Sequence, residues 1–259
     1  MSRWKGLGVA AVAALSLFAV KVLPWALGFA GGKYIYQTVA GSPDPQTLTT
    51  AQVSEQIQSQ GSQIFMAIKQ EFPGDYVAVV EKITAVVRLG NVEQVRNTSR
   101  LAVSDLRQRY ASLLSSAPDS KAAEALRAQL AMLNHVMARE TAATCNSYLR
   151  EGPGALSTLD QDFLTDMDKI GATLFHAFGA AKNGGLPAAA ASDEDWSLLA
   201  DAFMNVGGTP AEMDAIANIN REFEGLCPAV VKLYAAALSL QGEPGRHVKA
   251  ALLYEIARN

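Results

Sequence analysis

The chain has 259 residues, of which 49% are hydrophobic and 18% are charged, so it can bury a sizeable core and is not disordered throughout. Its 22 basic and 25 acidic side chains give a net charge of −3, whereas proteins that bind nucleic acid carry a basic excess. Two cysteines exclude a disulfide-dense small domain and a four-cysteine zinc site. We therefore expect no nucleic-acid partner, no metal and no cofactor.

The N-terminal segment is apolar and lacks acidic residues. Arg3 and Lys5 precede a run from residue 6 to residue 32 whose polar side chains are Ser16 and Lys21. About 20 residues of helix cross the hydrocarbon of a bilayer, so this run is long enough to span it. The sequence predicts a cytoplasmic start at 1–5 and a transmembrane anchor at 6–32.

Five residues mark this predicted anchor. Lys21 can extend its ammonium group toward one interface, and Pro24 would kink the helix near that point. Trp25 suits a position among the lipid headgroups. Gly28 and Gly32 form a Gly-xxx-Gly pair, a pattern found where membrane helices touch.

A cleavable signal peptide is the alternative interpretation of this segment. Arg3 and Lys5 would form its basic start, residues 6–20 its apolar stretch, and Gly28–Ala30 its cleavage site. The body would then be soluble in the periplasm. Both interpretations export the body, because the basic residues stay on the cytoplasmic side. The predicted location is the outer face of a bacterial inner membrane.

The acidic body follows a linker at 33–48, in which Pro43 and Pro45 oppose helix formation. Four of the 22 basic residues and none of the acidic ones lie in residues 1–33. The rest of the chain therefore carries 18 basic and 25 acidic side chains, a net charge of −7. We expect one extracytoplasmic domain at 49–259, which could comprise two subdomains that meet near residue 152.

Apolar residues recur at helical spacing along the whole body, which predicts an all-α fold. Proline and glycine pairs separate the segments, as at Pro73-Gly74 and Gly184-Gly185. The sequence predicts an irregular bundle of about nine helices. They cover 53–72, 76–87, 92–113, 119–151, 158–181, 193–203, 210–223, 228–238 and 248–256.

Cys145 and Cys227 are the candidate site residues of the body. Outside the cytoplasm, two cysteines favour a single disulfide, which would join the fourth predicted helix to the eighth. Closing so long a loop stabilises a fold by about 4 kcal/mol in the chain-entropy model. Two separate buried thiols are the alternative, because free cysteine packs as a small apolar residue.

Other polar residues have ordinary structural interpretations. We expect His176 to lie in the core or at an interface, and His247 to be solvated, because its neighbours are charged. The arginines between Arg96 and Arg109 suggest an exposed, salt-bridged helix face. Four aspartates near the start of the fifth predicted helix suggest a solvated first turn that complements the helix dipole. They are Asp160, Asp162, Asp166 and Asp168.

No sequence motif points to a reaction, because the chain contains no phosphate-binding loop, dinucleotide fingerprint or Gly-x-Ser-x-Gly turn. The sequence predicts a membrane-tethered interaction or scaffold subunit of a bacterial envelope complex. Its partners would be the bilayer and at least one envelope protein, in an oligomeric state that the sequence does not indicate. One alternative is an enzyme acting on peptidoglycan or another polymer, with a carboxylate pair that leaves no spacing signature. Another is a periplasmic carrier of a small ligand.

Overall fold

The computed structural model describes residues 45–218 and 222–258. Every regular element in this part of the chain is a helix, which confirms the all-α prediction. The α-helices are α3 (Thr50–Ser59), α4 (Gln63–Glu71), α5 (Pro73–Val87), α6 (Val92–Tyr110), α7 (Asp119–Arg139), α8 (Ala142–Glu151), α9 (Gln161–Gly184), α10 (Asp193–Asn205), α11 (Pro210–Asn218), α12 (Leu226–Ser239) and α13 (Gly242–Arg258). Short 3-10 helices are η1 (Pro45–Thr47), η2 (Ala111–Ser116) and η3 (Gly152–Ala155).

The predicted membrane anchor, with Lys21, Pro24, Trp25, Gly28 and Gly32, lies outside the described residues. Within the described residues, no helix combines the length and the apolar character that a bilayer-spanning segment needs. The anchor and the alternative signal peptide therefore stay predictions.

The predicted count of about nine helices was too low for the described residues, because two predicted helices are each broken in two. Gly61 has a left-handed φ of +72° and separates α3 from α4. The long helix expected at 119–151 ends at Arg139, and Thr141 begins a new one. The Thr141 hydroxyl accepts a 3.1 Å hydrogen bond from the backbone N–H of Thr144, which caps α8.

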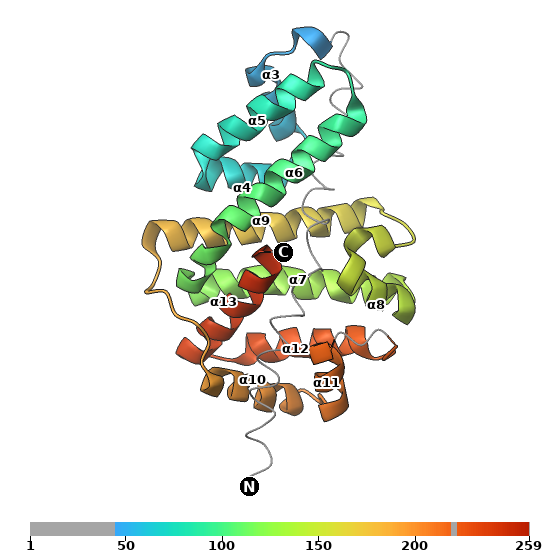
Figure 1. Ribbon diagram of the computed structural model, residues 1–259, viewed down its shortest axis with the longest axis vertical. Coiled ribbons are helices and arrows are strands. Elements are labelled where there is room, and N and C mark those ends of the chain that lie inside the picture. The colour runs from blue at the N-terminus through green and yellow to red at the C-terminus, as the bar shows by residue number, and fades with distance from the viewer. Residues whose placement is uncertain (1–44, 219–221, 259) are drawn as a thin grey trace.

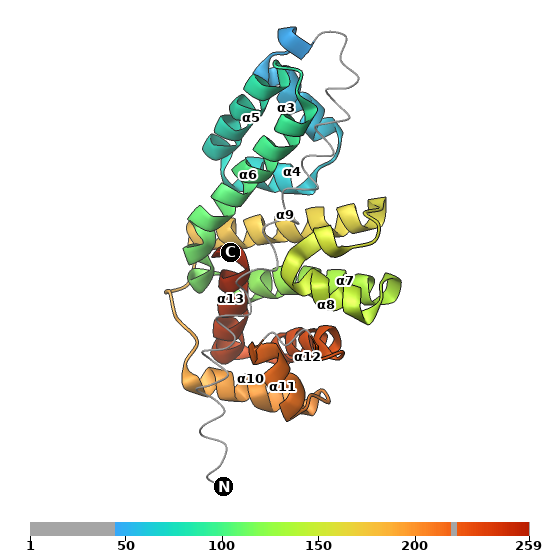
Figure 2. The same cartoon turned by 45° about the vertical axis from the view of Figure 1, so that its right-hand side comes forward.

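The helices are stacked in layers, as Figure 1 shows. Helix α9 packs on α4 on one side and on α7 on the other, and α7 in turn packs on α12 and α13. Helices α3, α5 and α6 form one end of the molecule, and α10 and α11 lie at the other (Figures 1 and 2). One hydrophobic core extends from Leu48 to Ala257, with contributions from both sides of residue 152.

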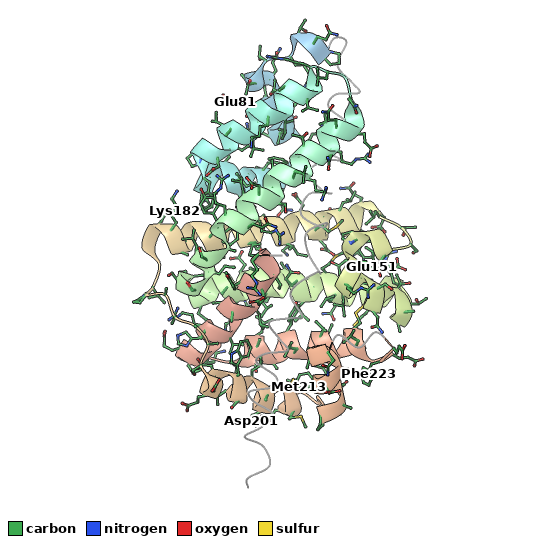
Figure 3. The ribbon with its side chains drawn as sticks, viewed as in Figure 1. Glu81, Glu151, Lys182, Asp201, Met213 and Phe223 are labelled. Carbon is green, nitrogen blue, oxygen red and sulfur yellow. A yellow bond between two sulfur atoms is a disulfide. The ribbon has the colours of Figure 1, made fainter. Side chains whose placement is uncertain are left out.

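Charged side chains cover the outside of these layers. Glu81 on α5, Lys182 on α9 and Asp201 on α10 are exposed and lie at the periphery in Figure 3. This distribution follows from the amphipathic pattern of each helix, whose apolar positions face the neighbouring layer.

Asp168 contradicts the expectation of a solvated acidic turn, because its side chain is buried in α9. It accepts hydrogen bonds from the Ser62 hydroxyl at 3.0 Å and from the backbone N–H groups of Gln63 and Ile64 at 2.6 and 3.1 Å. These groups form the start of α4, which has no cap from Ser62 itself. Asp168 therefore caps α4 from a helix about 100 residues away.

The other three aspartates of this group are partly or largely exposed, as expected, and each also has a polar partner. Asp160 caps α9 by accepting from the backbone N–H of Phe163 at 3.0 Å. Asp166 contacts His135 Nδ1 at 2.7 Å, and Asp162 lies 3.4 Å from an Arg139 nitrogen. These roles depend on neighbours in α7 as well as on the position of each residue in α9.

Arg107 contradicts the expectation of an exposed arginine face, because its side chain is fully buried. One guanidinium nitrogen donates to the backbone carbonyl of Ile256 at 2.6 Å. That carbonyl belongs to the last turn of α13, where the helix leaves acceptors unsatisfied. Burial lowers the pKa of Arg107 to about 10. Arg109 does follow the expectation, since it is half-exposed and pairs with Asp75 and Asp105.

Candidate functional site

The two cysteines come together as predicted. Cys145 in α8 and Cys227 in α12 lie at disulfide distance, with their α-carbons 5.9 Å apart. Both side chains are buried. A disulfide here joins two helices whose cysteines are separated by 82 positions in the sequence.

Asn146 positions the second cysteine, and its role was not predicted. Its side-chain oxygen accepts from the backbone N–H of Cys227 at 3.1 Å, and its side-chain nitrogen donates to the carbonyl of Phe223 at 3.0 Å. The first of these bonds caps the start of α12 from α8, and the second holds the chain just before that helix. No local signal identifies this role, because a side-chain cap from a distant helix has no fixed spacing.

A groove beside α13 in the described surface has a volume of about 540 Å³. Three walls form it: η2, the chain between α9 and α10, and α13. Trp196 of α10 and Tyr254 of α13 contribute aromatic rings, and Leu252 and alanine side chains supply most of the remaining surface. Glu255 is the one acidic residue in this lining, which contains no basic residue. The groove is therefore apolar with a single carboxylate.

The wall between α9 and α10 is a segment without regular secondary structure at 186–191. It follows Gly185, where a Cβ atom would collide with the carbonyl oxygens of Ala181 and Ser116. Two backbone hydrogen bonds hold the segment on η2: Leu186 donates to the carbonyl of Ser116 at 3.0 Å, and Ala189 to that of Ser115 at 3.2 Å. The glycine thus permits the close approach that places this segment beside the groove.

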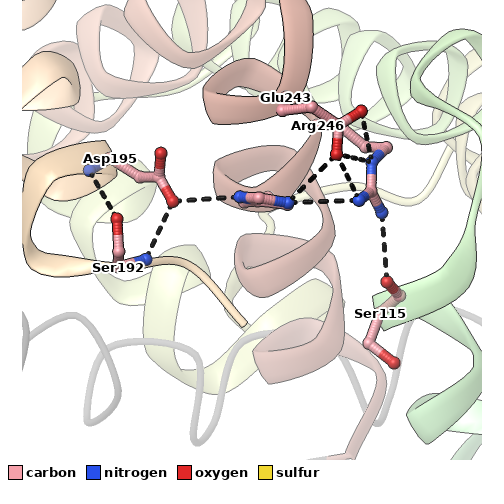
Figure 4. Close-up of polar contacts among 6 residues, drawn as sticks. Ser115, Ser192, Asp195, Glu243 and Arg246 are labelled. Atoms are coloured by element: carbon pink, nitrogen blue, oxygen red, sulfur yellow. Dashed lines mark hydrogen bonds and ion pairs between the residues drawn. The ribbon is translucent and has the colours of Figure 1, made fainter. Parts of the chain in front are cut away.

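A network of polar side chains lies next to the groove and joins α10, α13 and η2 (Figure 4). In the capping box of α10, Asp195 accepts from the backbone N–H of Ser192 at 2.8 Å. The same carboxylate oxygen contacts Nδ1 of His247 at 3.0 Å. Arg246 lies 2.6 Å from Glu243 and donates to the carbonyl of Ser115 at 3.3 Å. These bonds hold the first turns of α13 against both neighbours.

His247 was expected to be solvated, but its side chain is only 17% exposed, because α10 covers it. Burial alone raises the pKa of Asp195, but hydrogen bonds from Ser192 and His247 outweigh it, so this pKa lies below its usual value. The hydrogen bond from Arg246 similarly lowers the pKa of Glu243.

Ser192, Asp195 and His247 supply the residue types of a nucleophilic triad, but their arrangement differs from one. The Ser192 hydroxyl accepts from the backbone N–H of Asp195 at 3.2 Å, so it belongs to the helix cap. Nε2 of His247 lies near Arg246 and Glu243, at 3.1 and 3.4 Å. In a triad that nitrogen faces the attacking hydroxyl. The network thus positions helices and does not activate a nucleophile.

Lys249 adds a second buried anchor for α13. Its ammonium group donates to the carbonyl of Leu240 at 2.8 Å and lies 2.9 Å from a carboxylate oxygen of Asp119. Arg246 and Lys249 are each less than 5% exposed. The sequence did not reveal these contacts, because charged residues on a helix are usually solvated.

The remaining histidines also pair with carboxylates from other elements. His135 stacks on Phe163, with ring centroids 4.1 Å apart, while it contacts Asp166. His176 lies 2.9 Å from Glu71 at the end of α4, which agrees with its expected place at an interface between helices. Among the described residues, no three histidine, cysteine or acidic side chains gather in a way that could hold a metal ion.

Comparison with known proteins gives no relative: no family model, no curated protein and no solved structure matches this chain.

Proposed function

We propose that this protein is a membrane-tethered, extracytoplasmic helical subunit that binds another protein of a bacterial envelope complex. The observation that carries the proposal is the apolar groove beside α13. Its walls come from three elements that buried ion pairs and hydrogen bonds hold in place. A preformed apolar hollow with a few polar groups is typical of a binding site.

Two observations support the proposed location: the apolar N-terminal run and the cysteine pair. The apolar run at 6–32 follows basic residues that favour a cytoplasmic N-terminus. The cysteine pair at disulfide distance supports an oxidising compartment for the body, since disulfides are rare in the cytoplasm. A reporter enzyme that is active only after export, fused behind Asn259, should be active. Activity of a reporter that works only in the cytoplasm would contradict this topology.

The first test of the function is the native size of the full chain, extracted from its own membranes in mild detergent. We expect a discrete assembly larger than the monomer, whose other components identify the complex. A strictly monomeric protein at several detergent concentrations would contradict the proposal.

A second candidate function is transport of a small apolar ligand. The volume of about 540 Å³ favours it, because pockets for small ligands usually measure about 300 to 1,000 Å³. Mass spectrometry of the purified protein would detect a retained molecule of this kind. The enzyme alternative gains no support from this groove, since its described lining contains one carboxylate, whereas glycoside hydrolysis generally needs two.

A further inference from the structure

The segment at 186–191 has unused backbone hydrogen-bonding groups along the groove. Leu186 and Ala189 donate to η2, whereas the N–H groups of Ala188, Ala190 and Ala191 make no hydrogen bond to another described residue. Ala188 and Ala190 are exposed, and Ala189 and Ala191 are half-buried. Residues 188–191 carry only methyl side chains, which leave the backbone of these four residues accessible to a neighbouring chain.

The opposite wall offers side-chain contacts rather than hydrogen bonds. Trp196, Leu252 and Tyr254 line the groove with apolar surface, and Ala250 and Ala251 of α13 also line it. This combination of an open backbone edge and an apolar wall matches the recognition of an extended peptide. In that mode, main-chain hydrogen bonds give affinity, and pockets for alternate side chains give specificity.

Charge indicates one further property of the occupant. Glu255 in the lining is paired with Arg258 at 2.7 Å, and the chain after residue 33 has a net charge of −7. A basic side chain of a partner would be attracted to this body and could share the Glu255 carboxylate. An acidic segment would be repelled.

We propose that the groove binds an extended, apolar segment of a partner protein that carries one basic side chain. The segment pairs its backbone with residues 188–191 and directs the basic group toward Glu255. Four residues in extended conformation span about 13 Å, at about 3.3 Å per residue, so the contact is a short one. This inference rests on the proposed function, because it names the surface and the chemistry of the partner.

The test is site-specific photo-crosslinking in the full chain, expressed in its own membranes. A photoreactive amino acid replaces Ala190, and the control carries it at Ala85, an exposed position in α5 on a different part of the molecule. We expect a discrete protein adduct from position 190 and none from position 85. Mass spectrometry should map the crosslink to an apolar segment of another protein that contains lysine or arginine.

A second variant tests the groove by occupying it. Ala251 lies half-buried on α13 and lines the groove, so Ala251→Trp should fill it and lower the crosslinking yield from position 190 at least tenfold. The matched variant Ala85→Trp should leave that yield unchanged. Circular dichroism of both variants shows that any loss does not come from unfolding. Glu255→Gln should reduce the yield less than Ala251→Trp does.

Several outcomes would overturn the inference. They are no adduct at position 190, an adduct with a lipid or another small molecule, a crosslink to the N-terminal residues of the same chain, or a yield that Ala251→Trp does not change. If the large native assembly persists despite such a result, only the groove assignment fails. If no assembly exists, the proposed function fails as well.

Discussion

Replacing both cysteines with alanine removes the covalent link between α8 and α12 and so tests the disulfide directly. The residues lie 82 positions apart, and closing a loop of that length removes about 15 cal/mol/K of entropy from the unfolded chain in the chain-entropy model. At 25 °C this corresponds to about 4.5 kcal/mol of stability. We expect the double variant Cys145→Ala/Cys227→Ala to lose approximately this amount.

The same loss of stability can be expressed as a decrease in the melting temperature. Unfolding a body of the length of residues 49–259 releases about 440 cal/mol/K, at about 2.1 cal/mol/K per residue. A loss of about 4.5 kcal/mol therefore lowers the Tm by about 10 °C. The assay is circular dichroism of the full chain in mild detergent during heating, with and without a reductant.

The reductant provides the control for this experiment. It should lower the Tm of the natural protein to near that of the double variant and leave the double variant unchanged. Without reductant, alkylation of the denatured natural protein should label neither cysteine. The reasoning would be refuted by immediate labelling, or by a Tm that neither the substitutions nor the reductant moves by more than about 2 °C.

Three further predictions concern buried polar groups. Asp168→Ala should cost about 2 to 4 kcal/mol in the free energy of unfolding, because it leaves the buried Ile64 N–H and Ser62 hydroxyl unpaired. Chemical denaturation measures this loss, and a value below about 1 kcal/mol would contradict the prediction. Because the folded-state pKa of Asp195 is lowered, its stabilising contribution is present above its unfolded pKa and is lost as the pH falls through the folded value. Asp195→Asn should thus make the free energy of unfolding, measured in urea, less dependent on pH below about pH 4. An unchanged slope of this free energy against pH would refute the stabilising role of the Asp195 carboxylate. Arg107→Met should change the free energy of unfolding by less than about 1 kcal/mol, because it exchanges a buried charge for an apolar side chain of similar size. Arg107→Ala should cost about 3 kcal/mol, because it leaves a cavity. Equal losses for the two variants in thermal unfolding would argue against this prediction.

The helices of the body were largely predictable because helical periodicity is a local signal. The segment that became α9 was expected at 158–181 and runs from Gln161 to Gly184, because its apolar spacing and the Gly184-Gly185 stop act within a few residues. The predicted helix at 119–151 was wrong in one respect. Apolar residues recur at helical spacing on both sides of Glu140 and Thr141. At these two residues the chain leaves the helix, and Thr141 caps the start of α8.

The candidate site was much less predictable. Cys145 and Cys227 could be paired from sequence because the chain has two cysteines and therefore one possible partner for each. The groove left no comparable signal. Residues 186–191 lie between two predicted helices, and Trp196 is one of several apolar residues in the helix predicted at 193–203.

The sequence by itself determined the helical character of the body and its acidity, because these follow from composition and from spacing within one turn or two. For the two cysteines it left a disulfide and separate buried thiols as alternatives. Only the tertiary structure decided that Asp168 caps α4, that Arg107 is buried against the end of α13 and that His247 bridges to α10. The physical reason is that hydrogen bonds and desolvation depend on which groups meet in space. Partners about 50 to 150 residues apart leave no local pattern in the chain.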